Sequence, residues 1–572
     1  MRLAASVCLG LLAVLPAAAE PSPRWARALT LREKVAQLVV LPCYGEAPNV
    51  QSSEYLKYLG WVRGLKIGGL ALVNRVEDGL VRHSQPHALA AFLNQMQRAA
   101  RIPLLVAGDF ERGASMRIEC ETRLPHNMAF AAAGDPALSR AAGAVTARQA
   151  RALGVHWILA PVADVNNNPD NPIINIRSYG EDPHTVAAHV TAFLAGLRAD
   201  PRFPVLTTVK HFPGHGDTAT DSHLGLPVLG VDRRRLDAVE LTPFRAALHQ
   251  GVDSVMTAHI ALPALDPSGA PATLSPAVVT ELLRDELGFR GLIVSDALDM
   301  QGITRQFGAA EAAVKALAAG VDVLLMPADP EAAIDAVVQA VAEGRLRLER
   351  LERSLQRVLA AKMRLGLDRR RTVDLEAISR QLDAPEDVAL ASRASERALT
   401  LLKNEGHALP LRGTPCFLVL QEHRCATAGR LFAQEVLKRA PKAAVTVLDP
   451  AAAAPSLEEA CGANVQPIVV AAFVSAAAYR GNVALAGNYP RLMERLLASG
   501  KPVILVALGS PYLLRSFPGV TAYLATFSTV APSETAAVKA LFGEVPIQGR
   551  LPVTIPGLAR IGDGLKLAPT AR

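Results

Sequence analysis

Polar and charged residues follow several short apolar runs of the sequence, at positions where strands of a parallel sheet would end. These residues are Asp109, Asp164, Lys210, His211, His259 and Asp296. An unpaired charge at a buried strand end is costly. Several such residues together therefore indicate either a site for a polar ligand or a structural network of ion pairs. We favour the ligand site, with the ion-pair network as the alternative.

The densest group of these residues lies between Lys210 and Pro227, in a stretch with three histidines and two aspartates. Imidazole and carboxylate groups can bind zinc, but the stretch lacks H-E-x-x-H spacing, and its glycines and prolines predict an irregular loop. Asp221 and His223 offer a second interpretation, because a carboxylate bonded to an imidazole orients it and raises its basicity. We favour this dyad as a proton-transfer group and expect no bound metal.

Elements that could bring these residues together are predicted between about Thr30 and Pro327. Thr30 and Glu33 have the spacing of a capping box, which predicts a helix before the first strand. Short β-branched apolar runs then alternate with segments of helical length, which is typical of a parallel sheet. The eight runs lie near residues 37–41, 69–73, 104–107, 157–161, 205–210, 254–258, 292–296 and 321–326. Eight βα units in roughly 300 residues favour a (β/α)8 barrel of the TIM type, whose catalytic groups gather at the carboxyl ends of the strands.

A second domain is predicted after the barrel, because 572 residues are more than one ordinary core holds. A helical stretch at 330–365 leads into a charged segment at 368–387, which we interpret as a linker. Further apolar runs then alternate with helical segments. The runs lie at 416–420, 444–448, 468–473, 503–508 and 522–525, and the helical segments lie near 428–439, 490–499 and 534–542. We therefore expect a catalytic domain at 20–367 and a smaller three-layer α/β sandwich domain at 388–572.

The composition indicates a compact folded enzyme. Hydrophobic residues make up 50% of the chain and charged residues 20%, with no long polar tract, so a disordered scaffold is excluded. The net charge is +7, but acidic residues are spread among the lysines and arginines without a run of like charge. Nucleic-acid binding is therefore not indicated.

The N-terminal 19 residues have the features of a secretory signal, with Arg2 followed by an apolar run from Leu9 to Leu15 and small residues up to Ala19. This run is shorter than the roughly 20 apolar residues that span a bilayer, and no other stretch reaches that length without interruption. We expect cleavage after Ala19 and export to the periplasm or the medium, with no stable membrane span afterwards. An uncleaved anchor is the alternative.

Five cysteines remain after the predicted signal, and none has C-x-x-C spacing, so no zinc cluster is expected. Export permits a disulfide. Cys416 paired with Cys425 or with Cys461 is our first hypothesis, and buried free thiols are the alternative.

Several stretches of the sequence match the motifs of one enzyme family. The most specific is K-H-F-P-G-H-G-D-T-x-x-D-S-H-x-x-L-P, at residues 210–227. The others are N-P at 171–172, R-S-Y-G-E-D-P at 177–183, M-T-A-H at 256–259, G-F-R-G-L-I-V-S-D-A-L-D-M at 288–300, A-L-T-L-L-K-N at 398–404 and G-R-L-P-V-T-I-P at 549–556. With these motifs nearly the whole mature chain resembles glycoside hydrolase family 3, and within it the β-N-acetylglucosaminidase branch of the bacterial muropeptide-recycling enzymes.

The resemblance implies a retaining, exo-acting hydrolase that needs no cofactor. It makes Asp296 the nucleophile and makes Asp221 with His223 the acid/base dyad on a mobile loop. Asp299, the nearest rival carboxylate, matches no catalytic position of the family and is assigned a structural role. The implied sugar-binding residues are Asp109, Arg117, Arg177, Lys210 and His211. The implied substrate is a small glycan with terminal N-acetylglucosamine, from cell-wall fragments or chitooligosaccharides.

The sequence departs from the family pattern at residues 108–117, which read G-D-F-E-R-G-A-S-M-R in place of the usual D-Q-E-G-G-R-x-x-R text. Asp109 and Arg117 keep their spacing, so their implied roles survive. The departure leaves open the role of Arg112 and of groups beyond the first sugar.

Three alternative functions remain. A neutral histidine base avoids repulsion of an anionic acceptor, so a phosphorylase is one alternative. A family 3 β-glucosidase or β-xylosidase is the second, and the intact D-S-H loop argues against it. A non-catalytic cell-wall sugar-binding protein is the third, and it would be expected to lack Asp296 or His223.

Overall fold

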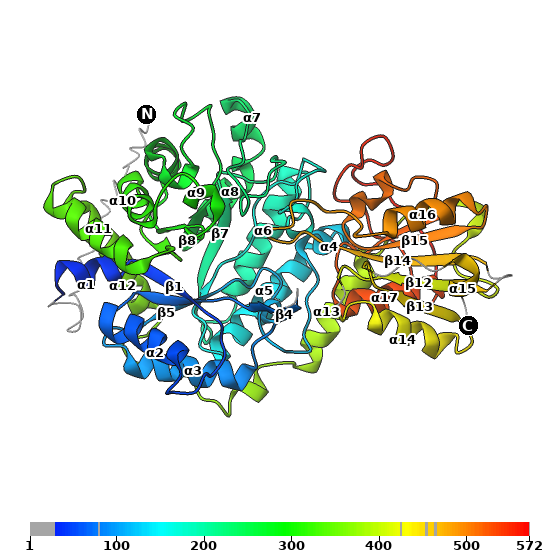
Figure 1. The fold of residues 1–572 in the computed structure, drawn as a ribbon, viewed down its shortest axis with the longest axis horizontal. Coiled ribbons are helices and arrows are strands. Elements are labelled where there is room, and N and C mark those ends of the chain that lie inside the picture. The colour runs from blue at the N-terminus through cyan, green and yellow to red at the C-terminus, as the bar shows by residue number, and fades with distance from the viewer. Residues whose placement is uncertain (1–28, 78–79, 424–425, 452–455, 463–465, 571–572) are drawn as a thin grey trace, which may run out of the picture.

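A computed structural model describes residues 29–77, 80–423, 426–451, 456–462 and 466–570, which form two α/β parts side by side (Figure 1). The predicted signal and Cys425 lie outside these residues. The first part contains an eight-stranded sheet and the second part a six-stranded sheet. This architecture confirms the predicted fold class, a barrel followed by a smaller α/β domain.

The first sheet is a nearly closed barrel of parallel strands. Neighbours follow chain order, the last strand pairs with the first, and a single bridge between Val294 and Val323 lies across the remaining gap. The strands are β1 (Val39–Cys43), β2 (Gly69–Leu72), β5 (Leu105–Gly108), β6 (Trp157–Ile158), β7 (Leu206–Phe212), β8 (Ser254–Thr257), β9 (Leu292–Ser295) and β10 (Leu324–Leu325). Each predicted apolar run overlaps one of them. A separate hairpin is formed by β3 (Arg75–Glu77) and β4 (Leu80–Arg82).

Helices surround the barrel (Figure 1). They are α1 (Leu31–Ala36), α2 (Ser53–Leu59), α3 (Pro86–Ala99), α4 (Asn127–Ala132), α5 (Pro136–Ala152), α6 (Pro183–Leu197), α7 (Arg233–Ala238), α8 (Leu241–His249), α9 (Gln301–Thr304), α10 (Ala309–Ala319), α11 (Pro330–Ala342) and α12 (Leu348–Arg364), with a π-helix at Ala277–Glu286. Strands β2, β5, β8 and β9 are wholly buried, because side chains fill the barrel on one face and helices cover the other. No helix of the described ranges is both long and apolar enough to cross a bilayer.

Local sequence explains where several of these helices begin. Thr30 and Glu33 form the predicted capping box at α1. Helices α5, α6 and α11 each start with an aspartate that caps the first turn and a proline that follows it; these aspartates are Asp135, Asp182 and Asp329. A carboxylate satisfies free backbone N–H groups at a helix start, and proline fits the first helical position.

The second sheet is mixed, with the order β11-β16-β15-β14-β12-β13. Its strands are β11 (Thr400–Asn404), β12 (Cys416–Leu420), β13 (Ala444–Leu448), β14 (Ile468–Val474), β15 (Val503–Gly509) and β16 (Ala522–Ala525). Helices α14 (Arg430–Arg439), α15 (Leu457–Cys461), α16 (Tyr489–Ala498) and α17 (Ala531–Leu541) complete this part. Edge strand β11 runs antiparallel to β16 and was not among the predicted runs, because only its first two residues are buried.

A disulfide joins Cys416, the first residue of β12, to Cys461, the last residue of α15. This is one of the two pairings put forward from the sequence. Cys43 and Cys120 are buried free thiols. The disulfide therefore lies wholly within the second part.

The predicted linker at 368–387 packs closely on the barrel. Its Val373 exchanges two hydrogen bonds of 2.8 Å with the Asn94 side chain of α3. Helix α13 (Pro385–Ala398) begins inside the predicted linker and contacts α4 and α5 of the first part and α17 of the second. Both parts therefore share one helix at their boundary.

Candidate active site

Asp296 lies directly after β9, at the carboxyl end of the barrel. Its backbone N–H donates to the Thr257 carbonyl at 3.1 Å, and its carboxylate accepts from the Ala297 N–H at 2.8 Å. Burial by itself raises the pKa of Asp296, but the imidazoles of His211 and His259 and the Ala297 N–H outweigh burial and hold this pKa below its usual value. The carboxylate is therefore ionised at neutral pH, as a nucleophile must be.

His259 supports the turn that holds Asp296. Its Nε2 lies 3.0 Å from the Ala297 carbonyl oxygen, and its Nδ1 lies 2.9 Å from the Thr273 hydroxyl. Burial lowers the pKa of His259, so the ring is neutral. These partners assign the proton to Nε2, which donates to the carbonyl, while Nδ1 accepts from the hydroxyl. His259 therefore fixes the peptide next to Asp296 and is not itself available as an acid.

Asp221 and His223 form the predicted dyad. One oxygen of the fully buried Asp221 carboxylate accepts from His223 Nδ1 and from the His223 backbone N–H, both at 2.9 Å. Burial by itself raises the pKa of Asp221, but these bonds and the imidazole charge outweigh burial and lower it. Because Nδ1 faces the carboxylate, Nε2 is the ring atom of His223 that remains for proton transfer.

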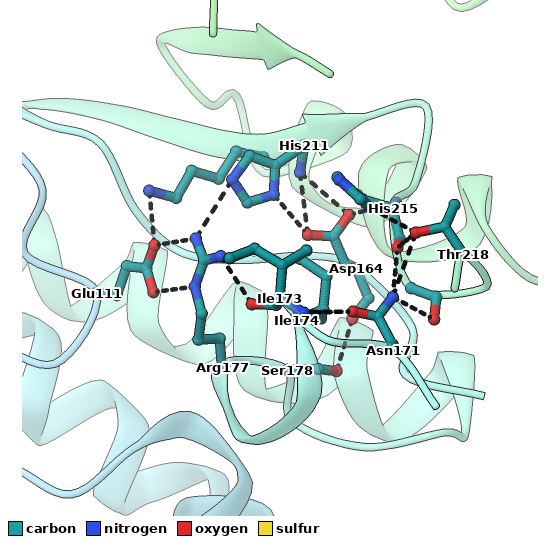
Figure 2. A network of polar contacts seen from close by, with 12 residues as sticks. Glu111, Asp164, Asn171, Ile173, Ile174, Arg177, Ser178, His211, His215 and Thr218 are labelled. Atoms are coloured by element: carbon teal, nitrogen blue, oxygen red, sulfur yellow. Dashed lines mark hydrogen bonds and ion pairs between the residues drawn. The ribbon is translucent and has the colours of Figure 1, made fainter. Parts of the chain in front are cut away.

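The loop between β7 and the dyad is held by Asn171, which Figure 2 shows bridging two segments. Its amide nitrogen donates to the carbonyl oxygens of His215 and Gly216 at 2.8 and 3.0 Å, and its amide oxygen accepts from the Ile174 N–H at 2.7 Å. A Cβ atom at Gly216 would lie 1.8 Å from the Val165 carbonyl oxygen. Glycine is therefore required for the loop to approach its neighbour this closely.

A network of alternating charges occupies the other side of the site. Arg177 donates twice to the buried Glu111 carboxylate, at 3.0 and 2.7 Å. Lys210 pairs with Glu111 at 2.7 Å and also with Asp109, which accepts from Arg117 at 2.9 Å. Burial by itself raises the pKa of Glu111, but Arg177 and Lys210 outweigh it and hold this pKa far below its usual value. Glu111, Asp109 and the three cations around them therefore present a fixed array of donors and acceptors.

His211 joins this network to a second buried carboxylate, as Figure 2 shows. His211 Nδ1 lies 2.7 Å from Asp164, which also accepts from the His215 backbone N–H at 2.7 Å. His211 Nε2 lies 3.4 Å from the Arg177 guanidinium. Burial by itself raises the pKa of Asp164, and the two histidines outweigh it and lower this pKa. Asp164 therefore orients His211.

The segment at 177–183 serves both the site and the contact between the two parts. Arg177 belongs to the charge network, while the Glu181 carboxylate accepts from the Thr554 N–H at 2.6 Å and from its hydroxyl at 2.5 Å. Gly180 has φ +148°, and a Cβ atom there would lie 2.6 Å from the Pro552 carbonyl oxygen. The second part thus packs against the segment that carries Arg177, a residue of the site.

The structure brings all eight predicted site residues to the same end of the barrel. Asp109, Arg117, Arg177, Lys210 and His211 are linked by direct contacts, and His211 and His223 both lower the pKa of Asp296. Asp299 lies beyond the end of β9 and is exposed, so it does not share the environment of Asp296.

Glu111 was missed from the sequence. It lies in the segment that departs from the family pattern. What identifies it as part of the site is its contact with Arg177, which is distant in the chain. The structural role of His259 was also not assigned from the sequence.

The three histidines of the 210–227 loop use their Nδ1 atoms toward different partners, namely Asp164, Thr218 and Asp221. Among the residues that the structure describes, no group of three or more His, Cys, Asp or Glu side chains is arranged to hold a metal ion. The loop geometry therefore favours the acid/base interpretation over the zinc interpretation.

Comparisons with known proteins agree with this geometry. Residues 30–361 match the Glycosyl hydrolase family 3 N terminal domain, and residues 399–560 match the Glycosyl hydrolase family 3 C-terminal domain. Beta-hexosaminidase A of Pseudoalteromonas piscicida is 31% identical over 525 residues, which cover 82% of this chain and 86% of that protein.

A second relative is the Beta-N-acetylglucosaminidase/beta-glucosidase of Cellulomonas fimi, 35% identical over 388 residues, which cover 66% of this chain and 65% of that protein. This match spans slightly less than two thirds of the Cellulomonas protein. A solved structure of a glycoside hydrolase family 3 β-N-acetylglucosaminidase from Paenibacillus sp. str. FPU-7 superposes with a TM-score of 0.82 at 33% identity, covering 92% of this chain and 99% of that one.

The barrel, the ionised strand-end aspartate, the histidine–aspartate dyad and the two family matches together show that this chain is an enzyme of glycoside hydrolase family 3.

Proposed function

We propose that this enzyme is an exported, retaining, exo-acting β-N-acetylglucosaminidase that acts on cell-wall fragments or chitooligosaccharides. The observation that carries the proposal is the ionised Asp296 beside the His223–Asp221 dyad at one end of the barrel. The names of the Cellulomonas relative and of the Paenibacillus structure support N-acetylglucosamine as the sugar, and the name of the Pseudoalteromonas relative supports a β-hexosaminide.

In the first step an Asp296 carboxylate oxygen attacks the anomeric carbon, and the bond from that carbon to the leaving oxygen breaks. The proton on His223 Nε2 passes to the leaving oxygen, while Asp221 stabilises the imidazolium that supplies it. The buried, hydrogen-bonded carboxylate of Asp221 fixes the ring so that Nε2 meets the leaving oxygen. The product of this step is a glycosyl–enzyme ester on Asp296.

In the second step water attacks the anomeric carbon, its proton passes to His223 Nε2, and the ester bond to Asp296 breaks. Two displacements at one carbon retain the β configuration. A neutral imidazole suits this step, since it acts as a base without adding a second negative charge beside Asp296.

The charge network is suited to hold the terminal sugar. Asp109 accepts hydrogen bonds from sugar hydroxyls, and Arg117, Arg177, Lys210 and His211 donate to hydroxyls or to the acetamido oxygen. Because Asp109 and Glu111 already fix Arg117, Arg177 and Lys210, these donors are oriented before the sugar binds.

The decisive assay compares nitrophenyl β-glycosides of N-acetylglucosamine, glucose and xylose, each with and without phosphate. We expect the N-acetylglucosaminide to be hydrolysed fastest, with the β anomer of the free sugar appearing first by proton NMR. A sugar phosphate as the main product would establish a phosphorylase instead. Preference for glucose or xylose would refute the assignment of the sugar.

Export is supported by the disulfide between Cys416 and Cys461, since disulfides persist mainly in oxidising compartments. Expression of the full-length chain in a bacterial host, followed by cell fractionation and N-terminal sequencing, tests this part of the proposal. We expect mature protein outside the cytoplasm that begins after Ala19. Unprocessed protein confined to the cytoplasm would contradict export.

A further inference from the structure

A loop of the second part reaches the dyad loop of the barrel. It lies between β14 and α16, and its Tyr479 packs edge-on against His223, with ring centroids 5.1 Å apart and ring planes at 61°. Two residues later, a Cβ atom at Gly481 would meet the Leu224 side chain at 3.4 Å. The loop therefore contacts the dyad loop at the catalytic histidine, and its Gly481 lies close to the residue after that histidine.

Contacts on both sides of Tyr479 hold it in this position. Glu422, which lies just beyond β12, accepts from the Ser475 N–H at 2.6 Å and pairs with the Arg480 guanidinium at 2.9 Å. Tyr479 itself has φ +65°, in the left-handed region that bulky residues rarely adopt. Such a backbone persists only where the surroundings determine it, and it is common at ligand-binding sites.

Tyr479 remains open to a ligand although it touches the catalytic residue. The residue as a whole is 59% exposed. Burial and the negative charges of Asp299 and Asp221 raise the pKa of its phenol, so the hydroxyl keeps its proton and can donate. An aromatic ring with a polar end offers both an apolar face and a hydrogen-bond donor.

The direction of proton transfer indicates what that face meets. His223 Nδ1 is bonded to Asp221, so Nε2 must protonate the leaving oxygen, and the leaving group must then lie beside the His223 ring. Tyr479 packs against that same ring. We propose that Tyr479 forms part of the binding subsite for the leaving group, and that the ligand it takes there is a sugar ring or another polar ring with an apolar face.

This inference rests on the proposed function, and a binding experiment separates the two. In the Asp296→Asn protein, calorimetry measures the affinity for N-acetylglucosamine and for its β-1,4-linked disaccharide, with and without Tyr479→Ala. We expect Tyr479→Ala to change monosaccharide affinity by less than about twofold and to weaken disaccharide binding roughly 5- to 20-fold, because only the disaccharide occupies the second subsite.

Two further variants refine the measurement. Tyr479→Phe keeps the aromatic face and should retain most of the disaccharide affinity. Leu437→Ala is the matched control, since Leu437 is an exposed apolar residue on α14 of the same part, 41% exposed, and it should bind both sugars as the parent does.

Turnover of the parent sequence and of Tyr479→Ala on two substrates distinguishes leaving-group binding from mere support of His223. One substrate is the disaccharide, and the other is the β-glycosyl fluoride, whose leaving group is too small to reach a second subsite. We expect kcat/KM to fall by roughly tenfold or more on the disaccharide and by less than about threefold on the fluoride. Equal losses on both, or no loss of disaccharide affinity, would overturn the subsite. Failure of the parent protein to bind or turn over any of these sugars would overturn the proposed function, and the subsite with it.

Discussion

Asp296 and His223 lie at the same end of the barrel, but the chain holds them in different ways. Asp296 follows a wholly buried strand, and its partners, Thr257 and Ala297, belong to the barrel itself. His223 lies on an irregular loop, where one oxygen of its partner Asp221 holds it through two hydrogen bonds. Tyr479 of the second part completes the surroundings of His223.

The difference teaches how the two-part architecture divides the chemistry. In the proposed mechanism the nucleophile is needed at one fixed point, the anomeric carbon, and a strand end in a packed barrel supplies that precision. The proton-transfer group serves two successive partners, first the leaving group and then water. A loop tied to a second part can accommodate both, while the barrel remains unchanged.

The largest expected effect is at Asp296. Asp296→Asn removes the nucleophile and should lower kcat by at least about 10⁴-fold, while circular dichroism and the melting temperature stay close to those of the parent. Steady-state kinetics on the nitrophenyl N-acetylglucosaminide provide the measurement. Near-parental turnover would break the comparison, because the barrel half would then not carry the nucleophile.

The next effect is at His223 and should depend on the leaving group. General acid assistance is typically worth about 10²- to 10⁴-fold, so His223→Ala should lower the rate that much on an alkyl glycoside and far less on a dinitrophenyl glycoside. Because the same residue activates water, azide should restore turnover of the dinitrophenyl substrate. Equal losses on both substrates with no azide rescue would show that His223 only binds the substrate or supports the loop.

Asp221→Ala should give a milder version of the same pattern, since it removes only the group that orients the ring.

A smaller effect is expected from the disulfide in the second part. The bond closes a loop with a sequence separation of 45, and its loss in the Cys416→Ala/Cys461→Ala protein should lower the stability of that part by about 2–4 kcal/mol. Calorimetry should show an earlier transition of the second part. If that part supports only the acid/base half, activity on the alkyl glycoside should be lost at a lower temperature than activity on the dinitrophenyl glycoside. Loss of both at the same temperature would argue against this division.

The smallest effect concerns the barrel alone. Lys362 of α12 is fully buried, with Gln37 accepting from it at 2.6 Å, and burial lowers its pKa to about 7. In the unfolded chain the pKa of a lysine is about 10.4. Between pH 7 and this value the unfolded chain therefore holds a proton on Lys362 that the folded barrel has lost, so stability rises with pH over this range. Relative to that of Lys362→Met, the free energy of unfolding of the parent should therefore rise by up to about 2 kcal/mol from pH 7.5 to 9.5.

The measurement for Lys362 is the free energy of unfolding of both proteins at each pH. Their kcat values should be equal, because Lys362 lies apart from the charge network and the dyad. If the difference in free energy of unfolding between the two proteins did not change with pH, Lys362 would carry its proton in both the folded and the unfolded state over this range.

Sequence alone predicted much of the barrel and named most of the residues that gather in the candidate site. Buried strands such as β2, with the sequence G-L-A-L, and β9, with the sequence L-I-V-S, are short and largely apolar runs, and this local pattern shows directly in the sequence. The position of Asp296 at the end of such a run, and the spacing of Asp221 and His223, are likewise local. Strand β11 escaped prediction because it is an edge strand with only two buried residues.

Only the tertiary structure decided which distant residues meet. Glu111 pairs with Arg177, 66 positions away along the chain, and Tyr479 reaches His223 from the other part of the molecule. The pairing of Cys416 with Cys461 depends in the same way on where α15 packs beside β12. Periodicity and spacing report a residue's relation to its chain neighbours. Partners in a network are chosen by the packing of whole elements, which no short stretch of sequence contains.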